Sequence, residues 1–157
     1  MKPYLLLTAA FVTLIACNKQ DPPPPADPSN VIGGVLSARI NGSRWEADMG
    51  YFERSDWDTA WLQLFAARNP NSAKLTDITL TITSYHGPGV YKIIKGVNTN
   101  TAVYSDNITP FKADTGTVTI VSQDTAYIRG SFSFEGLNDT LQSLRITEGQ
   151  FKLPVKQ

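Results

Sequence analysis

Aromatic side chains crowd into a short stretch of the chain, and this cluster has the clearest potential for binding chemistry. Between positions 45 and 65 lie six aromatic residues, among them all three tryptophans. Tyr51, Phe52 and Trp57 occupy the most charged and loop-like part, where exposed rings would stack on a sugar ring or a peptide. The alternative is that the rings fill the core, because large aromatic side chains dominate the cores of small domains. Trp45 and Phe65, which lie in strand-like runs, fit the core alternative best.

Residue types typical of catalysis or metal binding are present but poorly arranged. His86 is the only histidine and lies in a turn-like segment, and the chain lacks the Gly-x-Ser-x-Gly sequence of a nucleophile elbow. Asp56 and Asp58 offer oxygen atoms, but their surroundings lack the ordered spacing of a calcium-binding loop. A glycosidase pair of carboxylates has no sequence signature here. We therefore expect no enzyme activity, no metal and no cofactor, with a hydrolase of unrecognised site as the last alternative.

Three tripeptides consist of aspartate, threonine and an apolar residue, with their threonines at Thr59, Thr125 and Thr140. Such tripeptides resemble the O-glycosylation acceptors of Bacteroidota, which implies glycans on one or more of these threonines. Asp-Thr pairs are also common in turns for conformational reasons. Thr140 fits an acceptor best, because it follows the turn-forming pair Asn138-Asp139.

Composition limits the classes of partner. The chain has 157 residues with 14 basic and 14 acidic side chains, a length typical of one domain. Balanced charge provides no positive field for nucleic acid, so we expect no partner of that class. The single cysteine excludes a disulfide framework and a multi-cysteine zinc site within the chain.

The first residues have the pattern of a secretory leader. The uncharged, largely apolar run at 5–15 is shorter than the roughly 20 residues that span a bilayer and suits a signal peptide. Leu14-Ile15-Ala16-Cys17 resembles the bacterial lipobox, which implies a diacylglycerol on the sulfur of Cys17, cleavage before it, and acylation, for example with palmitate, of the new amine. Asn18 favours the outer membrane over the inner one. Both a periplasm-facing and a surface-exposed placement stay open.

The segment after the cysteine is rich in proline. Four consecutive prolines at 22–25 lack backbone donors and favour an extended polyproline II conformation. We expect a signal peptide over 1–16, a lipidated cysteine and linker over 17–33, and a β-domain over 34–157.

From position 34 onward the hydrophobic pattern has a period of two. Ile128, Gly130, Phe132 and Phe134 alternate with polar residues, which indicates strands with one buried and one solvated face. Asn41-Gly42 predicts a type I′ hairpin turn. The pattern predicts an all-β fold, an antiparallel sandwich or barrel of about nine short strands. These strands are expected near 35–40, 43–48, 60–67, 76–84, 89–94, 101–105, 116–122, 126–135 and 144–153.

Several short runs together resemble a family of small Bacteroidota outer-membrane lipoproteins of uncharacterised function. They begin at Ile40, Gly89, Gly116, Ile128 and Ile146, and the resemblance covers most of 35–153. It implies a lipid anchor and a β-domain, and it implies no catalytic residue.

These observations predict a non-enzymatic, lipid-anchored envelope domain that binds a glycan, a peptide or an envelope protein. The alternative is a structural or accessory subunit of an outer-membrane complex without a small ligand. Exposure of Tyr51, Phe52 and Trp57 around one surface would favour the binding domain.

Overall fold

The computed structural model describes residues 35–55, 60–97 and 99–156, and every regular element in these ranges is a β-strand. The all-β prediction is therefore confirmed. The strands are β1 (Leu36–Ile40), β2 (Ser43–Glu46), β3 (Met49–Ser55), β4 (Trp61–Arg68), β5 (Thr76–Thr83), β6 (Gly89–Ile94), β7 (Thr101–Asp106), β8 (Thr109–Gln123), β9 (Tyr127–Leu137) and β10 (Ser143–Pro154).

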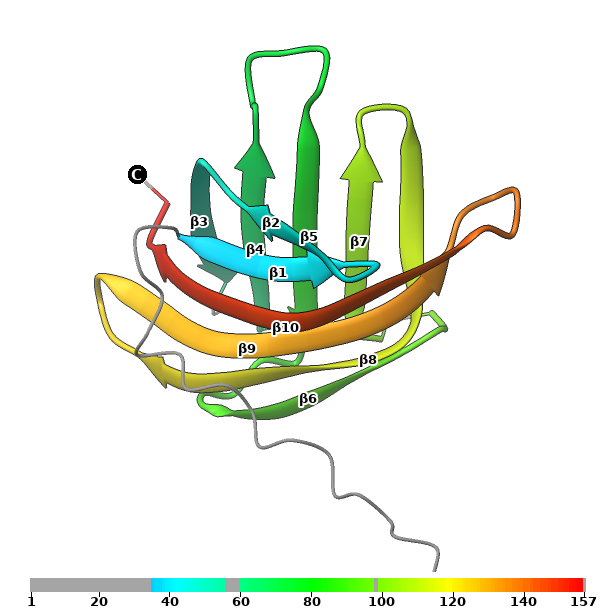
Figure 1. Ribbon diagram of the computed structural model, residues 1–157. Coiled ribbons are helices and arrows are strands. Elements are labelled where there is room, and N and C mark those ends of the chain that lie inside the picture. Colours follow the sequence, from blue (N-terminus) through cyan, green and yellow to red (C-terminus); the bar gives the residue numbers. More distant parts are fainter. Residues whose placement is uncertain (1–34, 56–59, 98, 157) are drawn as a thin grey trace, which may run out of the picture.

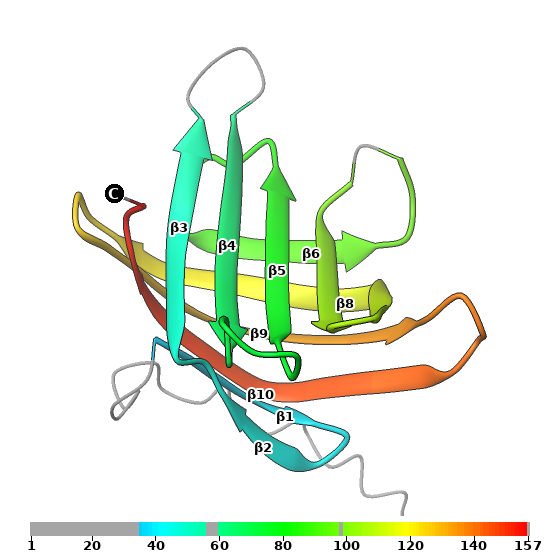
Figure 2. The same ribbon diagram turned by 90° about the horizontal axis from the view of Figure 1, so that it is seen from above.

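The strands form one antiparallel sheet that curls into a half-barrel. Its order is β2-β1-β10-β9-β8-β7-β5-β4-β3, and β6 pairs with β8 outside this path. Figure 1 shows β3, β4, β5 and β7 standing upright behind β1, β10, β9, β8 and β6, which run across them. The same crosswise arrangement is visible from above in Figure 2. The inner faces of these two layers enclose the core.

Strand β8 connects the two layers because it bends. Residues 109–112 pair with β7, whereas residues 115–120 pair with β6 on the same side. A register shift between Ala113 and Thr115 marks the bend. The sequence predicted a strand only from 116 to 122, whereas residues 109–123 form one 15-residue strand that includes the turn-forming residues 114–116. Turn-forming residues are also suited to a β-bulge, which bends a strand without ending it.

The core follows the predicted alternation. Ile78, Leu80 and Ile82 of β5 are fully buried. Phe132 and Phe134 of β9 are buried, while Ser131 and Ser133 face outward. Trp45 is buried as expected for a core residue, and its indole nitrogen donates to the Thr76 hydroxyl at 2.8 Å. This bond matters because an unpaired buried N–H would be costly.

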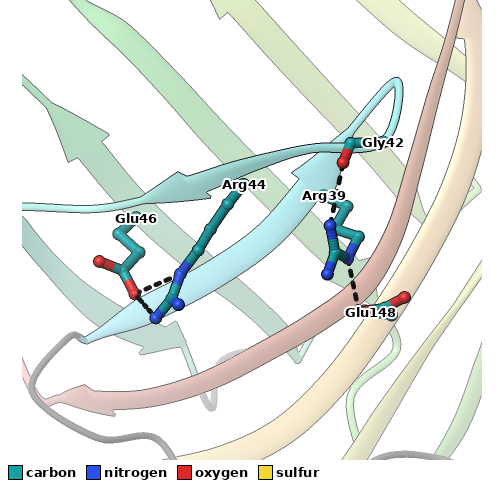
Figure 3. A network of polar contacts seen from close by, with 5 residues as sticks. All are labelled: Arg39, Gly42, Arg44, Glu46 and Glu148. Atoms are coloured by element: carbon teal, nitrogen blue, oxygen red, sulfur yellow. Dashed lines mark hydrogen bonds and ion pairs between the residues drawn. The ribbon is translucent and has the colours of Figure 1, made fainter.

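Two further features shape the edges of the sheet. Asn41 and Gly42 have φ values of 49° and 83°, which confirms the predicted turn between β1 and β2. On the edge strand β2, Arg44 forms an ion pair with Glu46, and Arg39 of β1 donates to Glu148 at 2.8 Å (Figure 3). Exposed pairs of this kind add little stability, but charged edge strands discourage pairing with another chain.

One strand was not expected. Residues 49–55 were predicted to be loop-like, yet they form β3 at the far edge of the sheet. The backbone N–H of Lys156 donates to the Phe52 carbonyl at 2.8 Å, and a parallel bridge joins Phe52 to Val155. Strand β3 is thus held by β4 on one side and by the end of the chain on the other.

Within the described ranges, no helix has the length and hydropathy needed to cross a membrane.

Candidate functional site

The outer face of β3, β4, β5 and β7 carries a flat array of half-buried aromatic and polar side chains, which we call the platform. The alternation along β4 shows which side chains belong to the platform. Leu62, Leu64 and Ala66 point into the core, so the residues that alternate with them point outward. The outward residues of β4 are Trp61, Gln63 and Phe65.

Tyr51 and Phe65 form the centre of the platform. They are directly paired across β3 and β4, and their ring centroids are 5.3 Å apart with an interplanar angle of 35°. The Lys156 ammonium lies 5.2 Å from the Tyr51 centroid and donates to Glu53 at 2.7 Å. The hydrogen bond and charge of Glu53 raise the pKa of Lys156. Lys156, which is held by Glu53, therefore lies over the half-buried Tyr51 ring as a cation–π partner.

Polar groups surround the rings in register. Glu53 is paired with Gln63, and Gln63 is paired with Thr81 of β5. Trp61 is paired with Ser55 on one side and Thr83 on the other. Hydroxyl and amide groups thus alternate with aromatic rings over one surface. Such a surface offers both stacking area and hydrogen bonds to a ligand that lies flat on it.

The structure separates Tyr51 from Phe52, two of the three residues that the sequence predicted to act together. Phe52 is only 3% exposed and packs in the core, so it is not part of an exposed stacking surface. Tyr51, its neighbour on β3, points to the opposite side because successive side chains of a strand alternate. Trp57 lies outside the described residues. Of the two predicted residues that the structure describes, Tyr51 belongs to the platform, where Phe65 and Trp61 join it.

A groove of about 550 Å³ opens where β8 leaves β7 and joins β6. We call it the fork groove. Its walls include Thr101 and Val103 of β7 and Lys112 of β8, and its rim includes Leu141, which is 78% exposed. On the rim, the Lys95 ammonium lies 2.9 Å from a carboxylate oxygen of Asp114.

A second cavity of about 580 Å³ lies at an open end between the layers. Phe52 and Arg54 of β3, the turn at 87–88 and the β8–β9 turn line it. Next to it, the buried Tyr85 hydroxyl donates to Gln123, and desolvation raises the pKa of Tyr85. His86 is exposed in this turn, and its Nδ1 lies 2.9 Å from the Ser84 carbonyl oxygen. The imidazole therefore faces a backbone carbonyl and not a nucleophilic side chain.

Two of the remaining predicted sites lie in described turns outside the platform. Thr125 is exposed in the β8–β9 turn, and Thr140 is exposed in the β9–β10 turn, where its hydroxyl donates to Asn138 at 2.9 Å. Cys17 and Thr59 lie outside the described residues. Among the residues placed in the structure, no group of three or more His, Cys, Asp or Glu side chains is arranged to hold a metal ion.

Comparison with known proteins identifies the domain. The family model described as Domain of unknown function (DUF6252) matches residues 34–153, which is most of the chain and all but the last residue of the ten-stranded sheet. The chain belongs to this family. No curated protein and no solved structure matches the chain.

Sequence reasoning missed two platform residues of this DUF6252 domain. Phe65 was assigned to the core, and Trp61 was given no role, although the run from Trp61 to Ala66 contains the relevant signal. Both alternating sets in this run are rich in apolar residues: Leu62 and Leu64 on one face, and Trp61 and Phe65 on the other. A strand that is apolar on both faces has a second partner for its outer face or exposes that face for binding.

Proposed function

We propose that this DUF6252 protein is a lipid-anchored envelope domain that binds saccharides on the platform and performs no chemistry on them. The observation that carries the proposal is the pairing of Tyr51 with Phe65 beside Trp61 on one outward sheet face. Sugar rings have apolar faces and hydroxyl edges. A surface of aromatic rings interleaved with hydroxyl and amide groups complements both.

The platform favours a saccharide over a protein strand as its ligand. Strands β4 and β5 beneath it are hydrogen-bonded to neighbouring strands on both sides, so a peptide strand lying on this face could not pair with their backbones. Only side chains are offered to a ligand. Stacking and side-chain hydrogen bonds therefore have to supply the affinity.

The anchor part of the proposal rests on the lipobox-like sequence ending at Cys17 and on the proline-rich segment after it. A lipid anchor and an extended linker would hold the domain near a membrane while leaving its surfaces accessible. Outer-membrane attachment is proposed on the same ground, because Asn18 follows the cysteine.

Affinity electrophoresis against a panel of soluble envelope and plant polysaccharides tests the binding. We expect at least one polysaccharide to retard the wild-type domain and the retardation to weaken in Trp61→Ala and Phe65→Ala. Removing one stacking ring should cost about 0.5–1.5 kcal/mol of binding free energy in addition to the loss of buried apolar area. This energy corresponds to a Kd that is roughly 2- to 12-fold weaker. Thermal melts of the same proteins establish that both variants remain folded.

Tyr127 provides a matched control. It is an exposed aromatic residue on the other layer, and Lys152 lies 5.0 Å from its ring centroid, much as Lys156 lies beside Tyr51. Tyr127→Ala should leave the retardation unchanged. If no polysaccharide retards the wild-type protein, the saccharide proposal fails and the accessory-subunit alternative takes its place.

A further inference from the structure

The platform does not end at its aromatic residues, because the strand register carries it to the fork groove. One row of paired outward residues runs from Tyr51 through Phe65 and Thr79 to Val103 and then Lys112. The neighbouring row runs through Glu53, Gln63 and Thr81 and ends at Thr101. Both rows lie on the same outer face.

The ends of these rows are also walls of the fork groove. Thr101, Val103 and Lys112 all line it. The platform and the concave site therefore share these three outward residues. The Val103 side chain supplies apolar surface at the junction, while the exposed Thr101 hydroxyl and Lys112 ammonium supply hydrogen-bond donors.

The length of this track indicates the size of its ligand. Neighbouring strands are about 4.8 Å apart, so four strand spacings from β3 to β8 correspond to roughly 19 Å. A single sugar ring covers only one part of that distance. A chain of several sugars would contact the Tyr51–Phe65 pair at one end and the groove at the other.

We infer that the ligand is a linear oligosaccharide several sugars long, which lies across β3, β4, β5 and β7 and places one end in the fork groove. This inference rests on the proposed saccharide binding and adds the chain length, direction and second subsite. The direction is perpendicular to the strands, because the two rows follow the cross-strand pairs.

Isothermal titration with size-defined oligosaccharides tests the inference. The probes are di-, tetra- and hexasaccharides of β-1,4-glucan, β-1,4-xylan, β-1,4-mannan, α-1,4-glucan, chitin and polygalacturonate, with a pool of unstructured 12-residue peptides as the competing class. In at least one series, affinity should rise by roughly tenfold or more from disaccharide to hexasaccharide. In Thr101→Trp, which fills the groove, and in Lys112→Ala, that rise should disappear while disaccharide affinity stays.

Two matched controls lie on the other layer. Thr117→Trp places the same indole on the outer face of β8 beyond the bend, and Lys92→Ala removes an exposed ammonium from β6. Both variants should keep the full rise in affinity from disaccharide to hexasaccharide. Thermal melts identify any variant that fails to fold, and Lys112→Ala then tests the groove without added bulk.

The possible outcomes separate the two proposals. If a disaccharide binds as tightly as a hexasaccharide and Trp61→Ala abolishes both, the extended track is refuted and the platform proposal stands. If affinity still rises with oligosaccharide length in Thr101→Trp and Lys112→Ala, the groove is not the second subsite. If no oligosaccharide binds at any length, or only the peptides bind, both proposals are refuted.

Discussion

Gly149 of β10 lies directly opposite Phe132 of β9, and the phenyl ring occupies the space that a Cβ at position 149 would need. That Cβ would meet Phe132 Cδ1 at 2.6 Å. The same relationship occurs between Gly130 and Phe151 across these two strands. The glycines thus leave room for large rings on the inner face of the sheet.

Replacing this glycine tests the packing. Gly149→Ala should lower the free energy of unfolding by about 1–3 kcal/mol, because the added methyl group overpacks the core. Chemical denaturation measures the change. Combining it with Phe132→Leu should cost less than the sum of the two single changes, since the smaller side chain makes room. Strict additivity would show that ring and glycine do not compete for space.

Phe132 and Ser131 are adjacent on β9 but face opposite sides. Phe132→Ala should lower stability by about 3–5 kcal/mol, because it removes a buried ring and leaves a cavity. Ser131→Ala should change it little, since surface substitutions usually lie within about 0.5 kcal/mol. Thermal melts of the two variants provide the comparison. Equal shifts would contradict the register of β9 against β8 and β10.

Asp77 lies on the outer face of β5, where burial raises the pKa of its carboxyl above the ordinary value of 3.8. Hydrogen bonds from Ser105 and Thr79 lower this pKa and so offset part of the effect. A raised pKa means that the folded state binds the proton more tightly, so stability is lost as pH rises through the folded-state pKa. Asp77→Asn should therefore melt higher than wild type at pH 7. The difference should vanish below pH 3.8, and a lower Tm at neutral pH would contradict this.

Asp124 in the β8–β9 turn shows the opposite behaviour. The backbone N–H groups of Tyr127 and Ala126 each donate to its Oδ1 at 2.7 Å, and they lower the pKa of this carboxyl. Its contribution to stability is present above pH 3.8 and is lost as pH falls through the folded-state pKa. Asp124→Ala should therefore lower Tm at pH 7, and the deficit should narrow in acid. Ser122→Ala, at an exposed position near the end of β8, should have no such pH dependence.

The lipid anchor can be tested independently of the fold. Cys17→Ala should abolish metabolic labelling with a fatty-acid analogue, because the lipobox-like sequence implies that the sulfur and the new amine carry the acyl chains. Asn18→Ala keeps the cysteine and should keep the label. Persistent label on Cys17→Ala would refute the lipobox interpretation.

Short-range sequence patterns were sufficient to predict the fold class, the buried faces of several strands and one hairpin turn. The alternation of apolar and polar residues along β5 and β9 correctly predicted which of their side chains are buried. Such alternation is a local property, because successive residues of a strand face opposite sides of the sheet. Asn41-Gly42 determined its turn, because few other residue pairs tolerate two positive φ values. The fold class followed from many such local signals.

The candidate site depends on contacts between segments that are distant in the sequence. Tyr51 and Phe65 are 14 positions apart, and their contact depends on β3 forming at all, which the charged segment 49–55 did not predict. Strand β3 exists because β4 and the end of the chain supply its hydrogen-bond partners. Residues 114–116 likewise have the composition of a turn, and only the pairing of β8 with β6, β7 and β9 makes them a bend in one strand. Register and partner choice depend on contacts between distant segments, so no local pattern contains them.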